Sequence, residues 1–355
     1  MSRIKVACGP VLVLGLAMAA ACSASKSGGG SDGTPTGPSA TVTAKIRTSD
    51  VLSGAAISGA TISGSGLTTG TTDGTGSLTL TTTNSSTYGI DVAGANYVTR
   101  NTLLKIPGGD ASVSLIKNDF DLSAFNQMFR NLPAADGSYA PGGLQRWTAA
   151  PALRIVSNVI EFNNSGPTYT ATAEALTPGE ITSITNDLNY GLPLLTGSVL
   201  GAFTGISTQM VAAGESVTLL TEGRITFARC SGLTAARGSA GYGQWLFRSD
   251  DVVTGGMLCV DRDFDLSNNP FGRGVRLHEL GHALGANHVQ PGVKPNVLMN
   301  PTISVNDVTS WDRDAAKIAF QRPTGNKTPD RDPASFSTNA LTTRVMTVAG
   351  CLVRR

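Results

Sequence analysis

The chain has 355 residues, enough for two or more domains at roughly 100–200 residues each. Charged residues make up only 15% and aromatic residues 6%, whereas glycine is abundant at 42, which favours short strands and turns over a long helical array. The formal net charge is +2. Without Arg3 and Lys5, which lie in a segment we expect to be removed, 25 basic residues balance 25 acidic ones, which excludes the basic surface of a nucleic-acid-binding protein.

The first residues have the pattern of an export signal. A short basic region, an apolar run over 6–21 and then small residues predict a signal peptide over 1–21. Residues 19–22, AAAC, end at Cys22 and resemble a bacterial lipobox, although Ala19 stands where leucine is favoured. The resemblance implies a lipid anchor on Cys22 and a place in the bacterial cell envelope, at the outer membrane or cell surface. Ordinary secretion is the alternative, and residues 22–40 form a flexible linker in either case.

The cysteines outside this leader are odd in number. An exported protein meets an oxidising compartment, where disulfides form. Cys230 and Cys259 both lie in strand-like segments, so we predict a disulfide between them. Cys351 is then free, or competes for one of the two.

Residues 41–117 form one compositional block in which Val, Ile, Thr and Leu alternate with small polar residues between recurrent turn signals. This alternation predicts a small antiparallel β-sandwich. The stretches GATISGSG, TTDGTGSLTL and YGIDVAGANYVTR resemble carboxypeptidase-regulatory-like and transthyretin-like modules. That resemblance implies a fold and favours a spacer, with adhesion to carbohydrate or protein as the alternative.

Residues 118–147 are predicted to connect this module to the next domain through a short helix. Within it, one helical face carries Leu122, Phe125, Met128 and Phe129, a stripe typical of packing rather than of a ligand site.

From 148 to 322 the pattern is that of an α/β (α+β) domain. Strands are predicted within 150–158, 215–230 and 254–264, and a last helix over 308–321. A further helix has clear start signals, with Thr177 as N-cap, Pro178 next and Glu180 at the third helical position. The tail over 323–355 begins rich in Pro and Thr and ends strand-like.

All three histidines of the chain fall within eleven residues, in HELGHALGANH. His278 and His282 are one helical turn apart on the same face, a spacing that lets both bind one zinc ion. Glu279 lies about 100° further round the helix, near the metal without sharing its row, which suits a general base. Leu277, Leu280 and Leu284 form a separate apolar stripe.

A glycine separates the second histidine from the third. A straight helix would swing His288 away from the metal, whereas a sharp turn at Gly285 brings it back as a third ligand. Three neutral histidines leave a fourth position for water, as catalytic zinc sites do. Zinc lowers the pKa of that water towards about 7, and Glu279 can take its proton.

The stretch HELGHALGANH matches the metzincin zinc-protease pattern H-E-x-x-H-x-x-G-x-x-H at every fixed position. Its first eight residues, HELGHALG, most resemble the matrixin branch of that family. The resemblance implies an active-site helix beside a mixed sheet, zinc on His278, His282 and His288, and Glu279 as general base and acid. It also implies a methionine turn at Met299. The edge strand that in metzincins pairs with substrate would be 254–264.

A second metal site is a further hypothesis. Asp261, Asp263 and Asp265 alternate in DRDFD, and matrixin-type domains often carry structural calcium. The EF-hand pattern fails here, because Leu266 and Gly272 stand where glycine and glutamate are needed, and a solvated strand end explains the aspartates equally well.

The sequence as a whole predicts a zinc endopeptidase that acts on protein or peptide substrates outside the cytoplasm. Two alternatives stay open: a surface adhesion or binding lipoprotein with a vestigial zinc site, and a zinc amidase acting on a non-peptide substrate.

Overall fold

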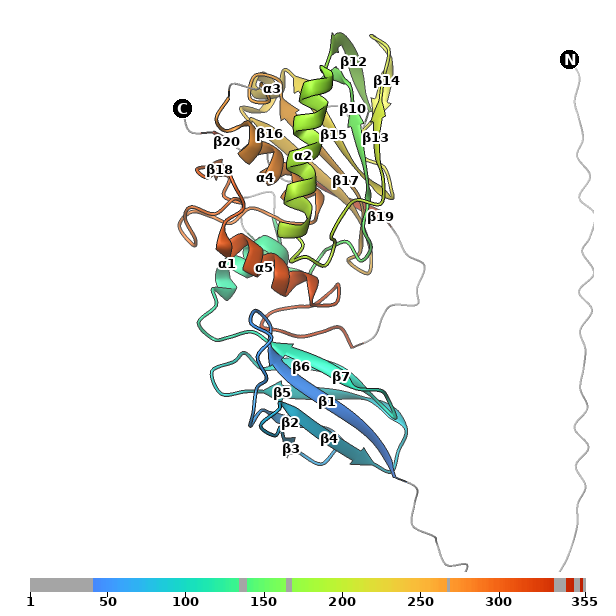
Figure 1. The fold of residues 1–355 in the computed structure, drawn as a ribbon, viewed down its shortest axis with the longest axis vertical. Coiled ribbons are helices and arrows are strands. Elements are labelled where there is room, and N and C mark those ends of the chain that lie inside the picture. Colours follow the sequence, from blue (N-terminus) through green and yellow to red (C-terminus); the bar gives the residue numbers. More distant parts are fainter. Residues whose placement is uncertain are drawn as a thin grey trace, which may run out of the picture. The chain divides into compact units, whose positions relative to one another are not determined.

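A computed structural model of the chain describes residues 41–353, apart from gaps at 134–138, 164–167, 267–268, 335–342 and 348–351. The predicted signal peptide, the linker, the lipidation candidate Cys22 and Cys351 lie outside the described residues. From Thr41 onward the chain forms one compact unit (Figure 1). It is mostly β, with several sheets and few helices, as expected of a multidomain α/β protein.

The N-terminal part of this unit consists of seven strands. They are β1 (Val42–Asp50), β2 (Thr61–Gly64), β3 (Gly70–Thr71), β4 (Ser77–Thr82), β5 (Ser86–Ala93), β6 (Arg100–Ile106) and β7 (Ala111–Leu115). Two sheets result, with the orders β4-β1-β7 and β3-β2-β5-β6. Their inward-facing side chains, Ile46 on β1 and Val92 on β5 among them, form one apolar core, because alternate residues of each strand point to the same face.

The rest of the described chain is built around a nine-stranded mixed sheet. Its strands are β10 (Ala152–Val156), β11 (Asn158–Glu161), β12 (Thr168–Ala175), β13 (Ile206–Gln209), β14 (Ser216–Thr218), β15 (Arg224–Ser231), β16 (Gly241–Arg248), β17 (Val253–Asp261) and β19 (Thr343–Thr347). The main order is β14-β12-β11-β15-β17-β16-β19; off this path, β10 pairs with β15, and β13 pairs with β10. Two short pairs stand apart, β8 (Asn131–Pro133) with β9 (Tyr139–Pro141), and β18 (Thr302–Ile303) with β20 (Leu352–Val353).

Five helices complete the described part, and four of them lie where the sequence predicted helices. They are α1 (Leu122–Phe129), α2 (Pro178–Leu194), α3 (Leu233–Arg237), α4 (Gly272–Ala283) and α5 (Ser310–Phe320). The predicted start of α2 is confirmed, since the Thr177 side chain accepts from the Glu180 N–H while the Glu180 side chain accepts from the Thr177 N–H. Of the predicted apolar face of α1, Phe125, Met128 and Phe129 are buried and Leu122 is half-buried. The short α3 was not expected.

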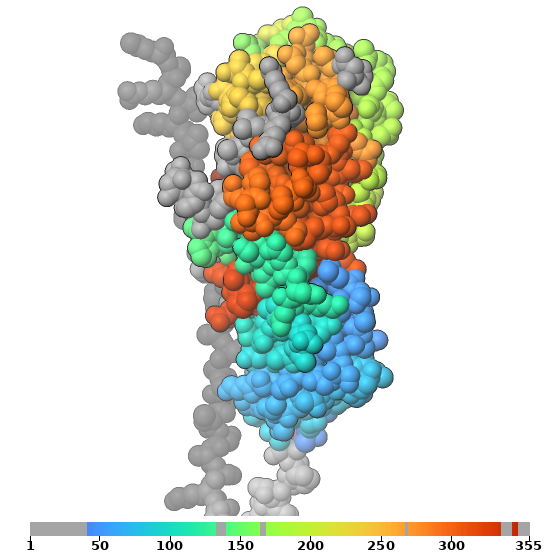
Figure 2. Space-filling model, turned by 90° about the vertical axis from the view of Figure 1, so that its left-hand side faces the viewer, coloured from blue at the N-terminus to red at the C-terminus, as the bar shows by residue number. Residues whose placement is uncertain are grey.

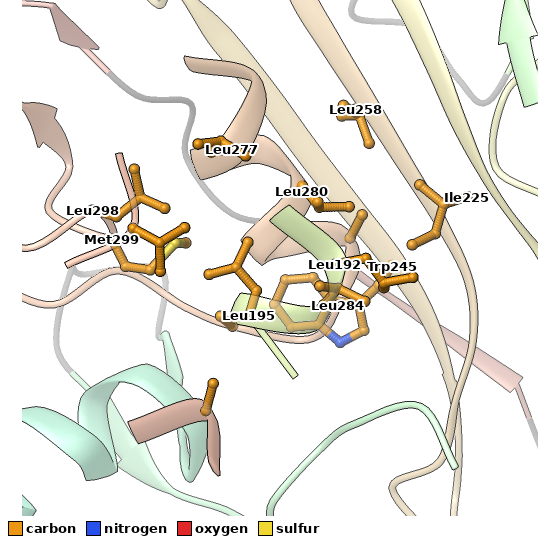
Figure 3. Close-up of a cluster of buried hydrophobic side chains, with 14 of the residues drawn as sticks. Leu192, Leu195, Ile225, Trp245, Leu258, Leu277, Leu280, Leu284, Leu298 and Met299 are labelled. Carbon is orange, nitrogen blue, oxygen red and sulfur yellow. The ribbon is translucent and has the colours of Figure 1, made fainter. Parts of the chain in front are cut away.

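The sheet and the helices share one large apolar core, which fixes α4 against the sheet. In Figure 3, leucines of α4 gather with side chains of α2, of its C-cap and of the sheet: Leu277, Leu280, Leu284, Leu192, Leu195, Ile225, Trp245 and Leu258. All three predicted stripe leucines of α4 are at most 1% exposed. Burial of each such side chain contributes roughly 1.5–3 kcal/mol, so this stripe holds the helix in place.

The strand that was predicted at the edge of the large sheet lies inside it. The strand over Val253–Asp261 was expected at the edge, but β17 lies between β15 and β16. The edge assignment followed from the metzincin resemblance and from the position of 254–264 just before the helix, whereas a near-continuous apolar run is typical of a strand buried on both faces. The strand β16 follows it in the sheet, and β19 pairs with the other side of β16.

None of the helices in the described residues is both long enough and apolar enough to cross a membrane.

Candidate metal centre

Helix α4 carries the first two histidines and then ends at a glycine. The C-cap is Leu284, and Gly285 follows with φ +103°, a conformation that side chains with a Cβ rarely adopt. The Gly285 N–H donates to the His282 carbonyl and the Ala286 N–H to the Gly281 carbonyl, the two hydrogen bonds of a Schellman motif. The chain therefore turns sharply after α4, as the sequence predicted, and brings His288 back towards the helix.

The three histidines meet at their Nε2 atoms. Nε2 of His288 lies 3.1 Å from Nε2 of His278 and 3.1 Å from Nε2 of His282. Nitrogens bound to one tetrahedral zinc at about 2.0–2.1 Å would stand about 3.3 Å apart. Within the described residues this is the one group of three or more His, Cys, Asp or Glu side chains with the geometry to hold a metal ion.

The other ring nitrogen fixes the tautomer of two of these histidines. Nδ1 of His278 lies 2.7 Å from the Leu298 carbonyl oxygen, and Nδ1 of His282 lies 2.7 Å from the Ala286 carbonyl oxygen. A carbonyl only accepts, so each Nδ1 carries the proton and each Nε2 presents a lone pair. Lone pairs that converge at this distance repel unless a cation lies between them, so the donor set fits a metal ion.

Burial keeps the imidazoles neutral, as metal ligands must be. His278 and His282 are 0% exposed and His288 is 6% exposed. Burial lowers the pKa of His278 to about 4, against a smaller opposing effect of the Leu298 carbonyl. Burial and the neighbouring histidines hold the pKa of His282 and of His288 well below the ordinary value. No proton therefore competes with a metal ion near neutral pH.

Met299 lies directly beneath α4. It is fully buried, and a Cβ at Gly281, between the two helical histidines, would overlap its Sδ atom. Its neighbour Leu298 supplies the carbonyl that orients His278. The Leu298 N–H donates in turn to Oδ2 of Asp312 on α5, at 3.0 Å. A chain of contacts thus runs from α5 through the loop to the first histidine.

Glu279 faces the strand β16 across two glycines. A Cβ at Gly241 would overlap the Glu279 carboxylate, and one at Gly243 would overlap the Cβ of His282. The absence of side chains at these positions lets α4 approach the strand and leaves room for the carboxylate. Glu279 itself is 0% exposed.

The loop that carries His288 is held on both sides. The Asn287 N–H donates to the Met128 carbonyl at the end of α1, and the Val289 N–H donates to the Met299 carbonyl. Figure 2 shows the teal residues of the α1 segment against the orange residues of the loop that follows α4. The connecting segment therefore helps to position the third histidine, a role that its apolar stripe did not indicate.

The aspartates suggested as calcium ligands serve other partners. Asp265 is buried between Arg229 and Arg276, with oxygen–nitrogen distances of 2.7 and 2.5 Å. Asp261 accepts from the Thr234 and Asp263 N–H groups. Within the described residues, the carboxylates of Asp261, Asp263 and Asp265 do not form a group of three that could share one metal ion.

The structure also joins Cys230 to Cys259, the pair that the sequence favoured, across the neighbouring parallel strands β15 and β17. Four positions that shape the site were not predicted from the sequence: Gly241, Gly243, Asn287 and Asp312. The signal for Asp312 was present, because Thr309 and Asp312 form a capping box at the start of α5. For the two glycines no signal existed, since their role depends on which strand faces α4.

Comparison with known proteins adds no family. No protein family and no curated protein matches this chain. Among solved structures, a chain described as "The Bacillus anthracis TIE protein" matches 61% of this chain at 11% identity and a TM-score of 0.19. The match takes up 41% of that chain, less than half of its length. A likeness this weak carries no argument about fold or function.

Proposed function

We propose that this chain is a zinc-dependent endopeptidase of the metzincin type, closest to matrixins, that hydrolyses proteins outside the cytoplasm. The observation that carries the proposal is the convergence of three neutral imidazoles on one point, with Glu279 next to the first of them in the chain. In the described residues no fourth ligand side chain closes this group, and a position for substrate or water is the mark of a catalytic rather than a structural zinc site.

Zinc bound by these histidines would supply Lewis acidity, polarising a peptide carbonyl and making water a better nucleophile at neutral pH. The residues of the chain supply the proton transfer and hold the metal ligands in position. Glu279 accepts the proton of the attacking water and passes it to the departing amine. The Leu298 and Ala286 carbonyls hold the rings of His278 and His282 in orientation. The apolar packing around α4 excludes bulk water, which strengthens each of these interactions.

The domain boundaries and the location of the protein belong to the same proposal. We place the peptidase domain at 148–322, preceded by the β-sandwich module at 41–117, and the protein in the bacterial envelope through Cys22. Strand pairing and a separate apolar core over 41–117 support the module.

The test is Glu279→Gln, which keeps the size of the side chain but removes the base. We expect one zinc per chain to be retained while hydrolysis of unfolded casein falls by about 10²–10⁴-fold, the usual contribution of a general base. Zinc content and casein turnover are measured together on wild type and variant. Glu161→Gln, at an exposed position of β11, is the matched control and should keep full activity. Equal turnover in wild type and Glu279→Gln would contradict the mechanism.

The near-complete burial of the site supports a second candidate, a binding lipoprotein whose zinc site no longer turns over substrate. Histidines and a glutamate with at most 6% exposure do not by themselves admit a polypeptide. Bound zinc without turnover of any protein or peptide would favour this candidate.

A further inference from the structure

The third histidine differs from the other two in what holds its backbone. His278 and His282 lie within α4, where the helix fixes their positions relative to each other. His288 follows the turn at Gly285 and lies in a stretch, 286–290, that is neither helix nor strand. Its Nε2 atom nevertheless lies 3.1 Å from the Nε2 atom of each of the other two. Contacts of the loop itself must therefore place His288.

Asn287, directly before His288, is bonded twice to the end of the α1 segment. Its N–H donates to the Met128 carbonyl at 2.7 Å, and its side-chain Nδ2 donates to the Asn131 carbonyl at 3.0 Å. Asn287 is 3% exposed, so the loss of either bond leaves a buried polar group without its partner. Backbone and side chain of one residue are thus fastened to the same neighbouring segment.

Helix α1 is a rigid support for this loop. Its apolar face packs in the large core, and Phe125 and Met128 are both 0% exposed. Arg130 at its C-cap is 1% exposed and donates to the Pro329 carbonyl at 2.7 Å. A helix packed on one side and hydrogen-bonded at its end has little room to move with the loop.

Two more contacts join α1 to the same loop, further along the chain from His288. The Gln127 Oε1 atom accepts from the Gln290 N–H at 2.9 Å, and the Asp121 Oδ2 atom lies 3.5 Å from Lys294 Nζ. The two side chains of this ion pair are 29% and 30% exposed, and exposed pairs contribute little. The buried bonds of Asn287 are therefore the firmest connection between α1 and the loop.

We propose that Asn287 is a positioning residue of the metal centre, which acts through His288. By fastening the loop to α1, it keeps the His288 ring where three imidazole nitrogens can share one ion. The proposal rests on the proposed function, because zinc is the ion that these histidines would hold. Helix α1 then belongs to the metal centre, although it precedes residue 148, where the peptidase domain was placed. Without the side-chain bond the third ligand is held less firmly, and zinc binds more weakly.

The first test is Asn287→Ala, which removes the Nδ2 donor and leaves the backbone N–H. We expect the zinc affinity of the full chain, measured by competition with a chelator, to fall about 10–100-fold, the usual cost of losing a group that supports a metal ligand. The matched control is Asn158→Ala. Asn158 is 8% exposed, and its Nδ2 donates to the Thr172 carbonyl at 3.3 Å. This control also loses an amide-to-carbonyl bond and should bind zinc as wild type does.

A second test asks whether the effect passes through His288. In a His288→Ala background zinc is held by His278 and His282 alone, so Asn287→Ala should lower the zinc affinity no further. Visible absorption of the cobalt(II)-loaded protein is a second readout, because its bands depend on the coordination geometry. Asn287→Ala should weaken the bands of a four-coordinate ion, and Asn158→Ala should leave them unchanged. An equal loss of affinity with and without His288 would overturn the proposal, since Asn287 would then act on the fold alone.

Gln127→Ala keeps the test decisive if Asn287→Ala does not fold. It removes an exposed bond to the same loop, and we expect zinc affinity to fall about two- to fivefold. Unchanged zinc affinity in every variant of the two that folds would overturn the role of α1.

The positioning role and the peptidase proposal can fail separately. If Asn287→Ala lowers zinc affinity while wild type hydrolyses no polypeptide, the positioning role stands and the peptidase proposal fails. If turnover depends on Glu279 but zinc affinity does not respond to Asn287→Ala, the peptidase proposal stands and the positioning role fails. A wild-type chain that binds no zinc would overturn both.

Discussion

At the scale of single residues, the site depends on backbone carbonyls as much as on the histidines. The Leu298 and Ala286 oxygens decide which nitrogen of His278 and His282 carries the proton, and so leave both Nε2 atoms for a metal. The Ala286 carbonyl reaches His282 because the chain reverses at Gly285. One glycine therefore ends the helix, returns the third histidine and orients the second.

Gly285→Ala tests this role. At φ +103° a Cβ is strained, and it would also lie 2.8 Å from the Gln145 carbonyl oxygen. We expect the free energy of unfolding to fall by about 1–3 kcal/mol, with weaker zinc binding because the Ala286 carbonyl shifts. Urea unfolding and a zinc competition titration measure the two effects. Gly292→Ala, where a Cβ meets nothing within 4 Å, should change neither; equal effects at both glycines would refute the role.

At the scale of elements, ion pairs join α2 and α4 to the sheet. Glu180 at the start of α2 accepts from Arg229 of β15 at 2.6 Å, and Arg229 also pairs with Asp265. Asp265 in turn pairs with Arg276 of α4, the helix of the histidines. Glu180, which the sequence identified as part of a helix cap, thus also forms an ion pair with a residue distant in sequence.

This network predicts how stability depends on pH. Partial burial raises the pKa of Glu180, but hydrogen bonds from Thr177 and Arg229 outweigh it and lower the pKa to about 2, from 4.5. A carboxyl with a lowered pKa stabilises the fold fully above its unfolded-state pKa, and the contribution is lost as pH falls through the folded-state value. We expect about 2 kcal/mol of stability from Glu180 at neutral pH, disappearing between roughly pH 4.5 and 2, after allowance for its partial exposure.

Urea unfolding of wild type and Glu180→Gln across this pH window is the measurement. The two stability curves should converge towards pH 2, whereas exposed Glu161→Gln should follow wild type. A gap between wild type and Glu180→Gln that persists unchanged at the acid end would contradict the assignment.

At the scale of the whole molecule, a buried charge cluster connects the N-terminal sheets to the part that carries the histidines. Asp330 lies between Arg130 and Arg322, and all three side chains are 0% exposed. Arg322 also donates to the side-chain and carbonyl oxygens of Ser114 in β7. Burial alone would raise the pKa of Asp330, but the guanidinium groups of Arg322, Arg100 and Arg130 keep it below the usual value.

Asp330→Asn leaves two arginines buried without their counter-charge. We expect a loss of about 3–5 kcal/mol, as for other broken buried pairs; we also expect wild type to unfold in a single transition and the variant in two. Calorimetry or two-probe urea unfolding detects the separation. The control is Asp250→Asn, which removes the more exposed pair with Arg248 and should cost about 1 kcal/mol or less. A loss no larger than that of the control would show that the cluster does not couple the two parts.

The sequence by itself determined whatever depends on short spacing. The capped start of α2, the leucine stripe of α4, the turn at Gly285 and the convergence of three histidines all follow from residues within a few turns of each other. The ion pairs of Asp265 and the place of Val253–Asp261 inside the sheet were not predicted, because both depend on neighbours distant in sequence. Only tertiary structure placed Gly241 opposite Glu279, Asp312 behind Leu298 and the strand of Thr343–Thr347 along β16. Strand order and helix docking arise from burial over the whole chain, and no local pattern of residues encodes them.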